Sequence, residues 1–331
     1  MKQFLLTALF LLAALIPAKG QVDQFYLEAR AGYAGAISGG KYNGGFNADH
    51  LNLILGGHIT PSVSYYWRQR FTKPLYDPKN ALNATDMLWI QWQASERWAF
   101  QAGKMAIMAG GYEFDDAPVD LYYWNLFSER TPQVYALGAC AWYTLTPGQQ
   151  LSLQVCQSPL AAGQATLLHA GLLWHGGFAP WWQTMWGVNW VDDPAHLGVC
   201  WLGLGNRLEA GPLAIELDFM YRHSLRQGAP KANLSSVCKL DLTLSNWTIF
   251  AKGGADYNAA DNANADGTSW DPIVPAGTRY FYAGGGLEFF PLRNDDMRLH
   301  AVAWVDNLNK APSFSVGLTY RFRIVKYLAK L

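Results

Sequence analysis

Apolar and polar side chains alternate every two residues along much of the chain. Between Leu213 and Arg222 the odd positions are Leu, Ile, Leu, Phe and Tyr, whereas Glu216 and Asp218 occupy even positions. The same alternation runs through Val237–Leu244 and Phe314–Ile324. Successive side chains of a β-strand point to opposite faces. Each segment is therefore predicted to be a strand with one apolar and one polar face.

Sixteen such strands are predicted after residue 20. They are expected at 24–37, 46–60, 62–72, 84–95, 97–110, 133–146, 148–158, 165–176, 180–191, 195–209, 212–224, 235–245, 247–257, 279–291, 297–307 and 311–324. Tight turns are expected at 60–61, 95–96, 146–148, 176–177, 209–211, 245–246 and 291–296. Longer connections are expected at 38–45, 72–84, 111–132, 159–164, 192–194, 225–234, 258–278 and 308–310, although 192–194 and 308–310 are short enough to weaken the pattern.

The alternation of short and long connections distinguishes between two classes of β protein. Strand periodicity alone also fits a soluble sandwich or a lipocalin. An even strand number, with tight turns at one rim and longer loops at the other, is typical of an outer-membrane barrel. The predicted fold is therefore an all-β, antiparallel transmembrane β-barrel of about 16 strands, wide enough to leave an aqueous channel.

The N-terminus has the three parts of a secretory signal peptide. Met1–Lys2 is basic, Phe4–Ile16 is apolar, and Ala18–Gly20 is a small-x-small cleavage site. The apolar part is shorter than the roughly 20 residues of a spanning helix, so a permanent anchor helix is the less favoured alternative. We expect residues 1–20 to be a cleaved signal peptide and residues 21–331 to form one barrel domain.

Composition agrees with a barrel that faces lipid. Charged residues make up 15% of the 331 residues and aromatic residues another 15%, with 25 Lys+Arg balancing 25 Asp+Glu. The mean hydropathy of −0.04 argues against a bundle of membrane helices. Zero net charge leaves no cationic excess to neutralise phosphates, so no nucleic-acid partner is expected.

Motifs for catalysis and for metal binding are incomplete. There is no H-E-x-x-H and no G-x-S-x-G, and Gly203-Leu204-Gly205 lacks the third glycine of a dinucleotide fingerprint. Cys140, Cys156, Cys200 and Cys238 form no C-x-x-C pair. Whether Cys140 pairs with Cys156 across a hairpin is left open. We expect no cofactor, no metal and no enzyme, with a hydrolase assembled from separate strands as a minor alternative.

The connection at 256–271 carries the first half of a calcium-loop pattern. Asn262-x-Asn264-x-Asp266-Gly267 alternates oxygen-bearing side chains before a glycine turn, but Ile273 stands where the bidentate Glu would be. A solvated, flexible outer loop is the preferred interpretation of this segment.

The segment from 98 to 132 carries a family resemblance. Its parts are Gly103-Lys104, then Gly110-Gly111-Tyr112-Glu113, then Asp115-Asp116, then Pro118-Val119-Asp120-Leu121-Tyr122. In these motifs the chain resembles the phosphate-selective porin O and P family, in its shorter Bacteroidetes-like form. The resemblance implies a sixteen-stranded homotrimeric porin, located in the outer membrane of a Gram-negative bacterium, that passes small hydrophilic solutes and ions.

Two departures from the family pattern limit what is carried over. Porins usually end on an aromatic residue, whereas Phe322 is followed here by nine residues ending in Lys330-Leu331. The polar faces also carry carboxylates beside the arginines, whereas a phosphate filter needs cations without competing acids. Phosphate selectivity is therefore not inferred. The carboxylates in question are Glu28, Glu216, Asp218, Asp241 and Asp306.

The third long connection, 111–132, is predicted to fold into the barrel, because its aromatic residues would be costly in open solvent. An outer loop packing on its neighbours is the alternative. Folding inward would carry acidic residues to the pore and place them opposite arginines of the first and third strands. The predicted constriction consists of Arg30, Arg68, Arg70, Glu113, Asp115, Asp116 and Asp120.

Taken together, these features predict an outer-membrane porin for passive diffusion of small hydrophilic solutes and ions. The alternative is a plugged outer-membrane barrel that acts as an adhesin or receptor.

Overall fold

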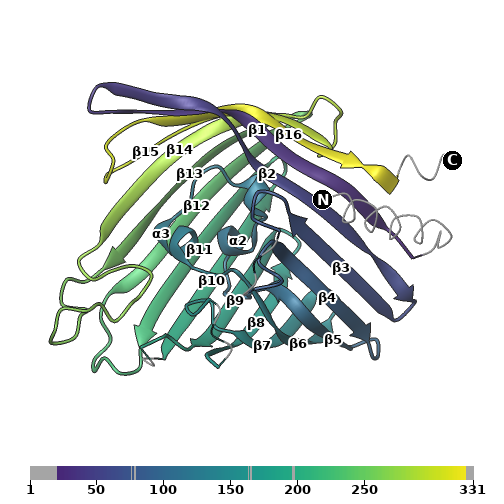
Figure 1. The fold of residues 1–331 in the computed structure, drawn as a ribbon, viewed down its shortest axis with the longest axis horizontal. Helices are drawn as coiled ribbons and strands as arrows, with labels where there is room; N and C mark the ends of the chain where they lie inside the picture. Colours follow the sequence, from purple (N-terminus) through teal and green to yellow (C-terminus); the bar gives the residue numbers. More distant parts are fainter. Residues whose placement is uncertain are drawn as a thin grey trace.

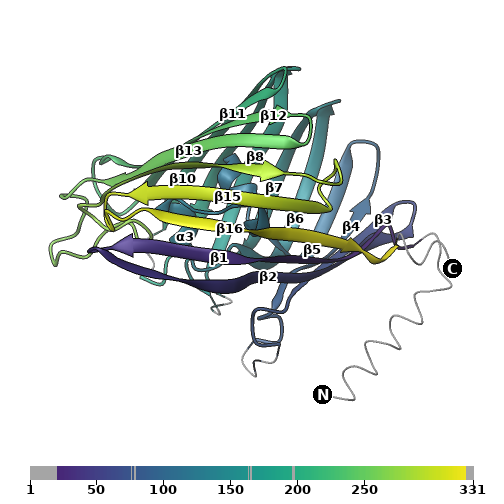
Figure 2. The ribbon, with the colours of Figure 1, turned by 90° about the horizontal axis from the view of Figure 1, so that it is seen from above.

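The chain forms a closed antiparallel barrel of sixteen strands (Figures 1 and 2). The computed structural model describes residues 21–75, 77, 80–162, 164, 166–195 and 198–325, so the expected signal peptide lies outside the described residues. Pairing of β1 with β16, from Tyr26↔Arg323 to Ala36↔Ser313, closes the sheet on itself. The strands are β1 Gln24–Ser38, β2 Lys41–Thr60, β3 Val63–Arg70, β4 Thr85–Gln93, β5 Trp98–Ala106, β6 Tyr135–Thr146, β7 Gln149–Gln157, β8 Leu168–Ala179, β9 Trp182–Val191, β10 Val199–Ala210, β11 Leu213–Ser224, β12 Asn233–Leu244, β13 Trp247–Asn258, β14 Arg279–Phe289, β15 Met297–Asp306 and β16 Ser313–Arg323.

The predicted strand number and the predicted division into two faces are confirmed. Leu217 of β11, Leu240 of β12 and Val316 of β16 point outward and stay 40–52% exposed in the isolated chain. Glu216 and Arg222, at the alternate positions of β11, are buried inside the barrel. Since the polar set of each strand faces inward, the outer surface is left apolar for lipid.

Two connections differ from their prediction. The expected loop at 38–45 is a two-residue turn, Gly39-Gly40, and both glycines have the positive φ values (57° and 73°) that a tight hairpin requires. The turn expected at Gly176-Gly177 lies instead at Pro180-Trp181, because β8 continues to Ala179. Proline lacks a backbone donor for the ladder, so it ends this strand where the glycines do not.

The remaining connections keep the predicted asymmetry. One rim carries the short turns 61–62, 94–97, 147–148, 180–181, 211–212, 245–246 and 290–296. The other rim carries 71–84, 158–167, 192–198, 225–232, 259–278 and 307–312. We call them the turn rim and the loop rim. Within the described residues no helix is long and apolar enough to cross a membrane.

The connection between β5 and β6 lies inside the barrel. It spans residues 107–134 and contains two short α-helices, α2 Tyr112–Asp115 and α3 Leu126–Arg130, with a 3-10 turn, η1 Pro118–Asp120, between them. In Figure 1 both helices are seen within the outline of the barrel, in front of the rear strands. We call residues 107–134 the inner loop.

Cys140 and Cys156 are free and buried on the inner face. Cys140 pairs in register with Gln154, and Cys156 with Gly138, so the two cysteines are offset by two residues across the β6–β7 hairpin.

Candidate functional site: the inner loop and the wall that holds it

The first residues of the inner loop pack directly against Gly187 of β9 and Gly203 of β10, which we call the glycine seat. A Cβ added to Gly203 would lie 2.5 Å from the Ala109 carbonyl oxygen, and one added to Gly187 would lie 2.8 Å from it. Gly111, with φ 95°, donates its N–H to the Met185 carbonyl. Because these strand positions lack side chains, the loop backbone presses directly on the sheet. Gly203-Leu204-Gly205, incomplete as a nucleotide motif, therefore has a packing role here.

Polar side chains of the wall also hold the first residues of the loop. Gln154 donates to the Ala106 carbonyl at 2.9 Å and accepts from Met108 N at 3.0 Å. Asn189 donates to the Ala109 carbonyl at 2.8 Å. Both side-chain amides are fully buried. These inward-facing polar groups of β7 and β9 therefore use their hydrogen bonds to hold the loop.

Two inward-facing carboxylates accept hydrogen bonds from the first backbone N–H groups of α2 and α3. Asp218 of β11 accepts from Tyr112 N at 2.9 Å and from the next amide at 2.7 Å. Asp256 of β13 accepts from Leu126 N at 2.8 Å. Free N–H groups at a helix start favour a negative charge, which explains why acids stand at these wall positions.

A buried ion pair fixes the middle of the loop. Lys252 Nζ of β13 lies 2.6 Å from Glu113 Oε2, and both side chains are 4% exposed. Lys252 also donates to the Tyr123 carbonyl at 2.6 Å, and Glu113 accepts from Asn125 N at 2.9 Å. Since further hydrogen bonds satisfy both charges, burial of this pair is tolerated.

The tip of the loop is held by arginines from the opposite side of the barrel. Arg30 of β1 donates to the Val119 and Leu121 carbonyls at 2.9 and 2.7 Å. Arg298 of β15 donates to the same Val119 carbonyl at 2.8 Å and pairs with Asp120 at 2.8 Å. Arg321 of β16 lies 3.2 Å from Asp120 as well. The loop is thus tied to β7 and β9–β13 near its ends and to β1, β15 and β16 at its tip.

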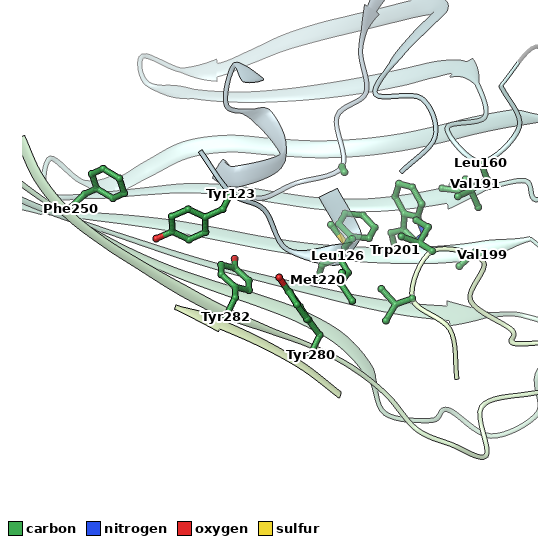
Figure 3. Packing of buried hydrophobic residues seen from close by; sticks show 14 of the residues in the cluster. Tyr123, Leu126, Leu160, Val191, Val199, Trp201, Met220, Phe250, Tyr280 and Tyr282 are labelled. Carbon is green, nitrogen blue, oxygen red and sulfur yellow. The ribbon is translucent and has the colours of Figure 1, made fainter. Parts of the chain in front are cut away.

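An apolar cluster fills the space between the loop and the β9–β15 wall (Figure 3). Tyr123, Leu126 and Phe127 of the loop pack against Trp201 and Met220 of the wall. The ring of Phe127 meets the Trp201 ring edge-on, with centroids 5.1 Å apart. This half of the barrel interior is therefore a packed core.

The connection 259–278 also enters the barrel, contrary to the expectation of a solvated, flexible loop. Ile273 and Val274 are at most 2% exposed and join the same apolar cluster. Asp271 pairs with Arg222 Nε at 2.6 Å, and both side chains are fully buried. Asn262 of the calcium-like pattern donates to Asn258, and no cluster of three or more potential metal ligands exists among the described residues.

Three buried residues beside the loop base have the order of a catalytic triad. Cys156 Sγ lies 3.4 Å from His169 Nδ1, and His169 Nε2 lies 3.0 Å from Asn189 Oδ1. A nucleophile, a base and an orienting group follow one another in this way in cysteine hydrolases. The three side chains are only 0–2% exposed, however, so no substrate carbonyl reaches the sulfur without movement of the wall.

Comparison with known proteins agrees with this geometry. Residues 27–180 match the family model described as phosphate-selective porin O and P. OmpF of Salmonella typhi in complex with daunomycin superposes with a TM-score of 0.68, at 11% identity, over 92% of this chain and 99% of that chain. The anion-selective porin from Comamonas acidovorans superposes with a TM-score of 0.65, at 8% identity, over 90% and 98% of the two chains.

The chain has the fold of the outer-membrane porins and, over residues 27–180, resembles the phosphate-selective porin O and P family in sequence. The outer membrane channel DcaP of Acinetobacter baumannii is a further structural neighbour, with a TM-score of 0.60, 13% identity, and coverage of 90% and 96%. Among curated proteins no match is found. The resemblance inferred from the motifs at 103–122 and the location in a Gram-negative outer membrane are thereby confirmed.

The predicted constriction residues of the porin fall into two groups. Arg30, Glu113 and Asp120 hold the loop, through the contacts described above, and are not free charges facing each other across water. Arg68 and Arg70 of β3 share one carboxylate, Asp86, at 3.5 and 2.9 Å. Asp115 and Asp116 have no ion pair within 4 Å among the described residues.

Desolvation raises the pKa of both loop acids, that of Asp115 above its usual range. It raises the pKa of Asp116 to about 7, although the nearby ammonium group of Lys239 acts in the opposite direction. Asp116 therefore carries its charge for only part of the time at neutral pH.

Sequence reasoning missed several of the wall residues that hold the loop. Lys252, Asp256 and Arg298 occupy inward positions of strands that were correctly located, and their charge on a buried face was the available signal. The apolar run Ile273-Val274 in an otherwise polar connection was the signal for the second inward loop.

Two recesses border the inner loop on the turn-rim side. One, of about 390 Å³, lies against β1, β3 and β16 and is lined by Tyr26, Tyr66 and Arg68 among others. The other, of about 260 Å³, lies between the loop and β10–β15.

Proposed function

We propose that this porin is a passive diffusion channel whose narrowest point lies between the inner loop and the inner face of β3–β8. The observation that carries the proposal is the one-sided attachment of the loop. Its first residues are also held by Gln154 of β7, but from Ala109 to Arg130 its hydrogen bonds and ion pairs to the wall are to β1 and to β9–β16. Most of its apolar side chains pack against β9–β15. The opposite wall keeps a polar recess of about 250 Å³ lined by Gln91, Gln93 and Gln150. We propose that the solute path runs along that wall.

The charges at the proposed constriction are Asp115 and Asp116 on the loop and Arg68 and Arg70 on β3. Together they produce a transverse field that orients dipolar solutes and disfavours apolar ones. Since the signs nearly balance, we propose weak net ion selectivity. Arg30, Glu113 and Asp120 contribute by fixing the position of the loop.

Single-channel recording tests the proposal. Purified, heat-modifiable protein in a planar bilayer should give discrete, ohmic current steps, and liposomes that contain it should swell in a hexose solution. A barrel whose folding is verified but which passes neither ions nor hexose would contradict the channel and would favour a plugged adhesin or receptor.

We also propose that the porin has no enzymatic activity and assembles as a homotrimer. The first point is supported by the burial of Cys156, which has a base and an orienting group beside it but is closed off from solvent. The second rests on the family resemblance. Hydrolysis of ester or peptide substrates that is lost in Cys156→Ala would contradict the first, and a monomeric mass in mild detergent would contradict the second.

A further inference from the structure

The recess below the inner loop has an unbalanced set of charges. Its volume is about 260 Å³, and its lining includes four cations and five carboxylates. The cations are Arg207, Lys239, Lys252 and Arg298; the carboxylates are Asp116, Asp120, Glu216, Asp241 and Glu288.

Four of the five carboxylates have a cationic partner. Glu216 pairs with Arg207 at 2.7 Å, and Asp241 with Lys239 at 3.1 Å. Arg298 pairs with Asp120 of the inner loop at 2.8 Å and with Glu288 of β14 at 3.3 Å. The fifth, Asp116, has no ion pair within 4 Å among the described residues.

The fourth cation is not available to Asp116. Lys252 is 4% exposed and is occupied by Glu113 and by the Tyr123 carbonyl. The recess therefore has a carboxylate with no cation within 4 Å among the described residues. The ammonium group of Lys239, which is paired with Asp241, acts on Asp116 only from a greater distance. A mobile cation is the partner that balances the charge, whereas a mobile anion meets an excess of acids.

We propose that this recess binds solutes that carry a primary ammonium group, with Asp116 as the counter-charge. The inference rests on the proposed channel function and gives that channel a preferred class of solute. An ammonium group donates three hydrogen bonds. The neighbouring Asp241, Thr243 and Thr248 line the same recess and offer further acceptors to it or to hydroxyl groups on the solute. Pyranose-sized amines match the volume.

The test uses three sugars that differ in charge but little in shape. Glucosamine, glucose and glucuronate are each titrated against the potassium current of single channels at low salt. Glucosamine should reduce the current along a saturating curve, glucose should do so weakly, and glucuronate should have no saturable effect. In 1 M KCl the glucosamine effect should shrink, because the Debye length falls to about 3 Å.

Two adjacent carboxylates provide a matched pair of variants. Asp116→Asn should weaken the apparent affinity for glucosamine about fivefold, the upper range for loss of a partly exposed ion pair. Asp115→Asn removes the same charge one residue away, at a position that does not line the recess. It should shift the reversal potential while changing the glucosamine affinity less than about twofold.

The outcomes separate this inference from the channel itself. If potassium and glucose pass but glucosamine shows no saturable effect, or if both variants weaken it equally, the recess does not bind amines and the porin function stands. If neither potassium nor glucose passes through verified folded protein, the channel and the inference are both overturned.

Discussion

At the scale of single residues, the charges inside the barrel divide into those that hold the inner loop and those that stay open to the pore. Arg30, Lys252 and Arg298 are at most 8% exposed and donate to backbone carbonyls of the loop. Asp115 and Asp116 on the loop lack ion pairs among the described residues. Substitutions in the first group should therefore affect loop position, and substitutions in the second group should affect selectivity.

The charges at the proposed constriction predict opposite shifts in ion selectivity. Arg68→Ala with Arg70→Ala should move the reversal potential toward cations, since two positive charges are lost from β3. Asp115→Asn with Asp116→Asn should move it toward anions. Both shifts should be measured in a salt gradient across a planar bilayer and should shrink in 1 M salt. A reversal potential that neither double variant changes at low salt would remove these residues from the narrowest point.

The pKa of Asp116, raised to about 7 by burial, predicts that selectivity varies with pH near neutrality. Above pH 8 the group is ionised and adds a negative charge to the pore, and below pH 6 it is protonated and neutral. Cation preference should therefore fall as the pH falls between these values. The control is Asp116→Asn, in which this part of the pH dependence should be absent. An equal pH dependence in wild type and variant would assign the titration to another group.

At the scale of elements, the inner loop owes its position to the wall rather than to its own helices. α2 and α3 have four and five residues, too few for a stable isolated helix. Their starts are held by Asp218 and Asp256, and their apolar side chains pack on β9–β15. Loosening the wall contacts should thus free the loop while the barrel stays closed.

Lys252→Met tests the buried ion pair. It leaves Glu113 unpaired in a site that is 5% exposed, which costs about 3–5 kcal/mol. We expect frequent transitions between conductance levels in single-channel records, because the loop moves. The double variant Lys252→Met with Glu113→Gln should partly restore steady currents. Arg207→Met, which breaks the more exposed pair with Glu216, is the control and should leave the records steady.

Gly203→Ala tests the glycine seat. The new methyl group would lie 2.5 Å from the Ala109 carbonyl oxygen, so the base of the loop has to shift. Altered conductance with unchanged heat-modifiable mobility is the expected result. The control is Gly45→Ala, where no atom lies within 4 Å of the added Cβ. Wild-type conductance in Gly203→Ala would show that the added methyl group is accommodated without a shift of the loop base.

At the scale of the whole molecule, the barrel separates lipid from a polar interior, because alternate residues of each strand point outward and inward. Leu240 of β12 faces outward, and Thr243 of the same strand lines the recess inside. Closure through β1 and β16 leaves no free strand edge, which is what a sheet in lipid requires.

Insertion into the membrane should therefore depend on which face receives a charge. Leu240→Arg places a charge near the middle of the lipid-facing surface, at a cost of about 2–4 kcal/mol, and should lower the yield of folded barrel. Thr243→Arg adds the same charge to the wet interior and should insert normally. The measurement is the heat-modifiable fraction after refolding into lipid. Equal yields from both variants would mean that the two faces of β12 are assigned wrongly.

The sequence by itself determined the strands, the two faces and the two rims, because these follow from local periodicity and from turn residues. It located β11, β12 and β16 closely and placed Glu216 on the polar, inward face. Its errors were also local: the glycines at 176–177 were interpreted as a turn, although glycine, unlike proline, leaves the ladder intact.

Only the tertiary structure decided which inward charges meet. Arg30 reaches the Val119 carbonyl across 89 positions of sequence, and Arg321 reaches Glu28 across 293. Barrel closure and the path of the inner loop create these contacts. Neither can be predicted from a repeating pattern of residues in the sequence. The number of acids and arginines on the inner face was therefore readable from the chain. Their division into loop anchors and open pore charges was not, because that division depends on distances that the closed fold alone sets.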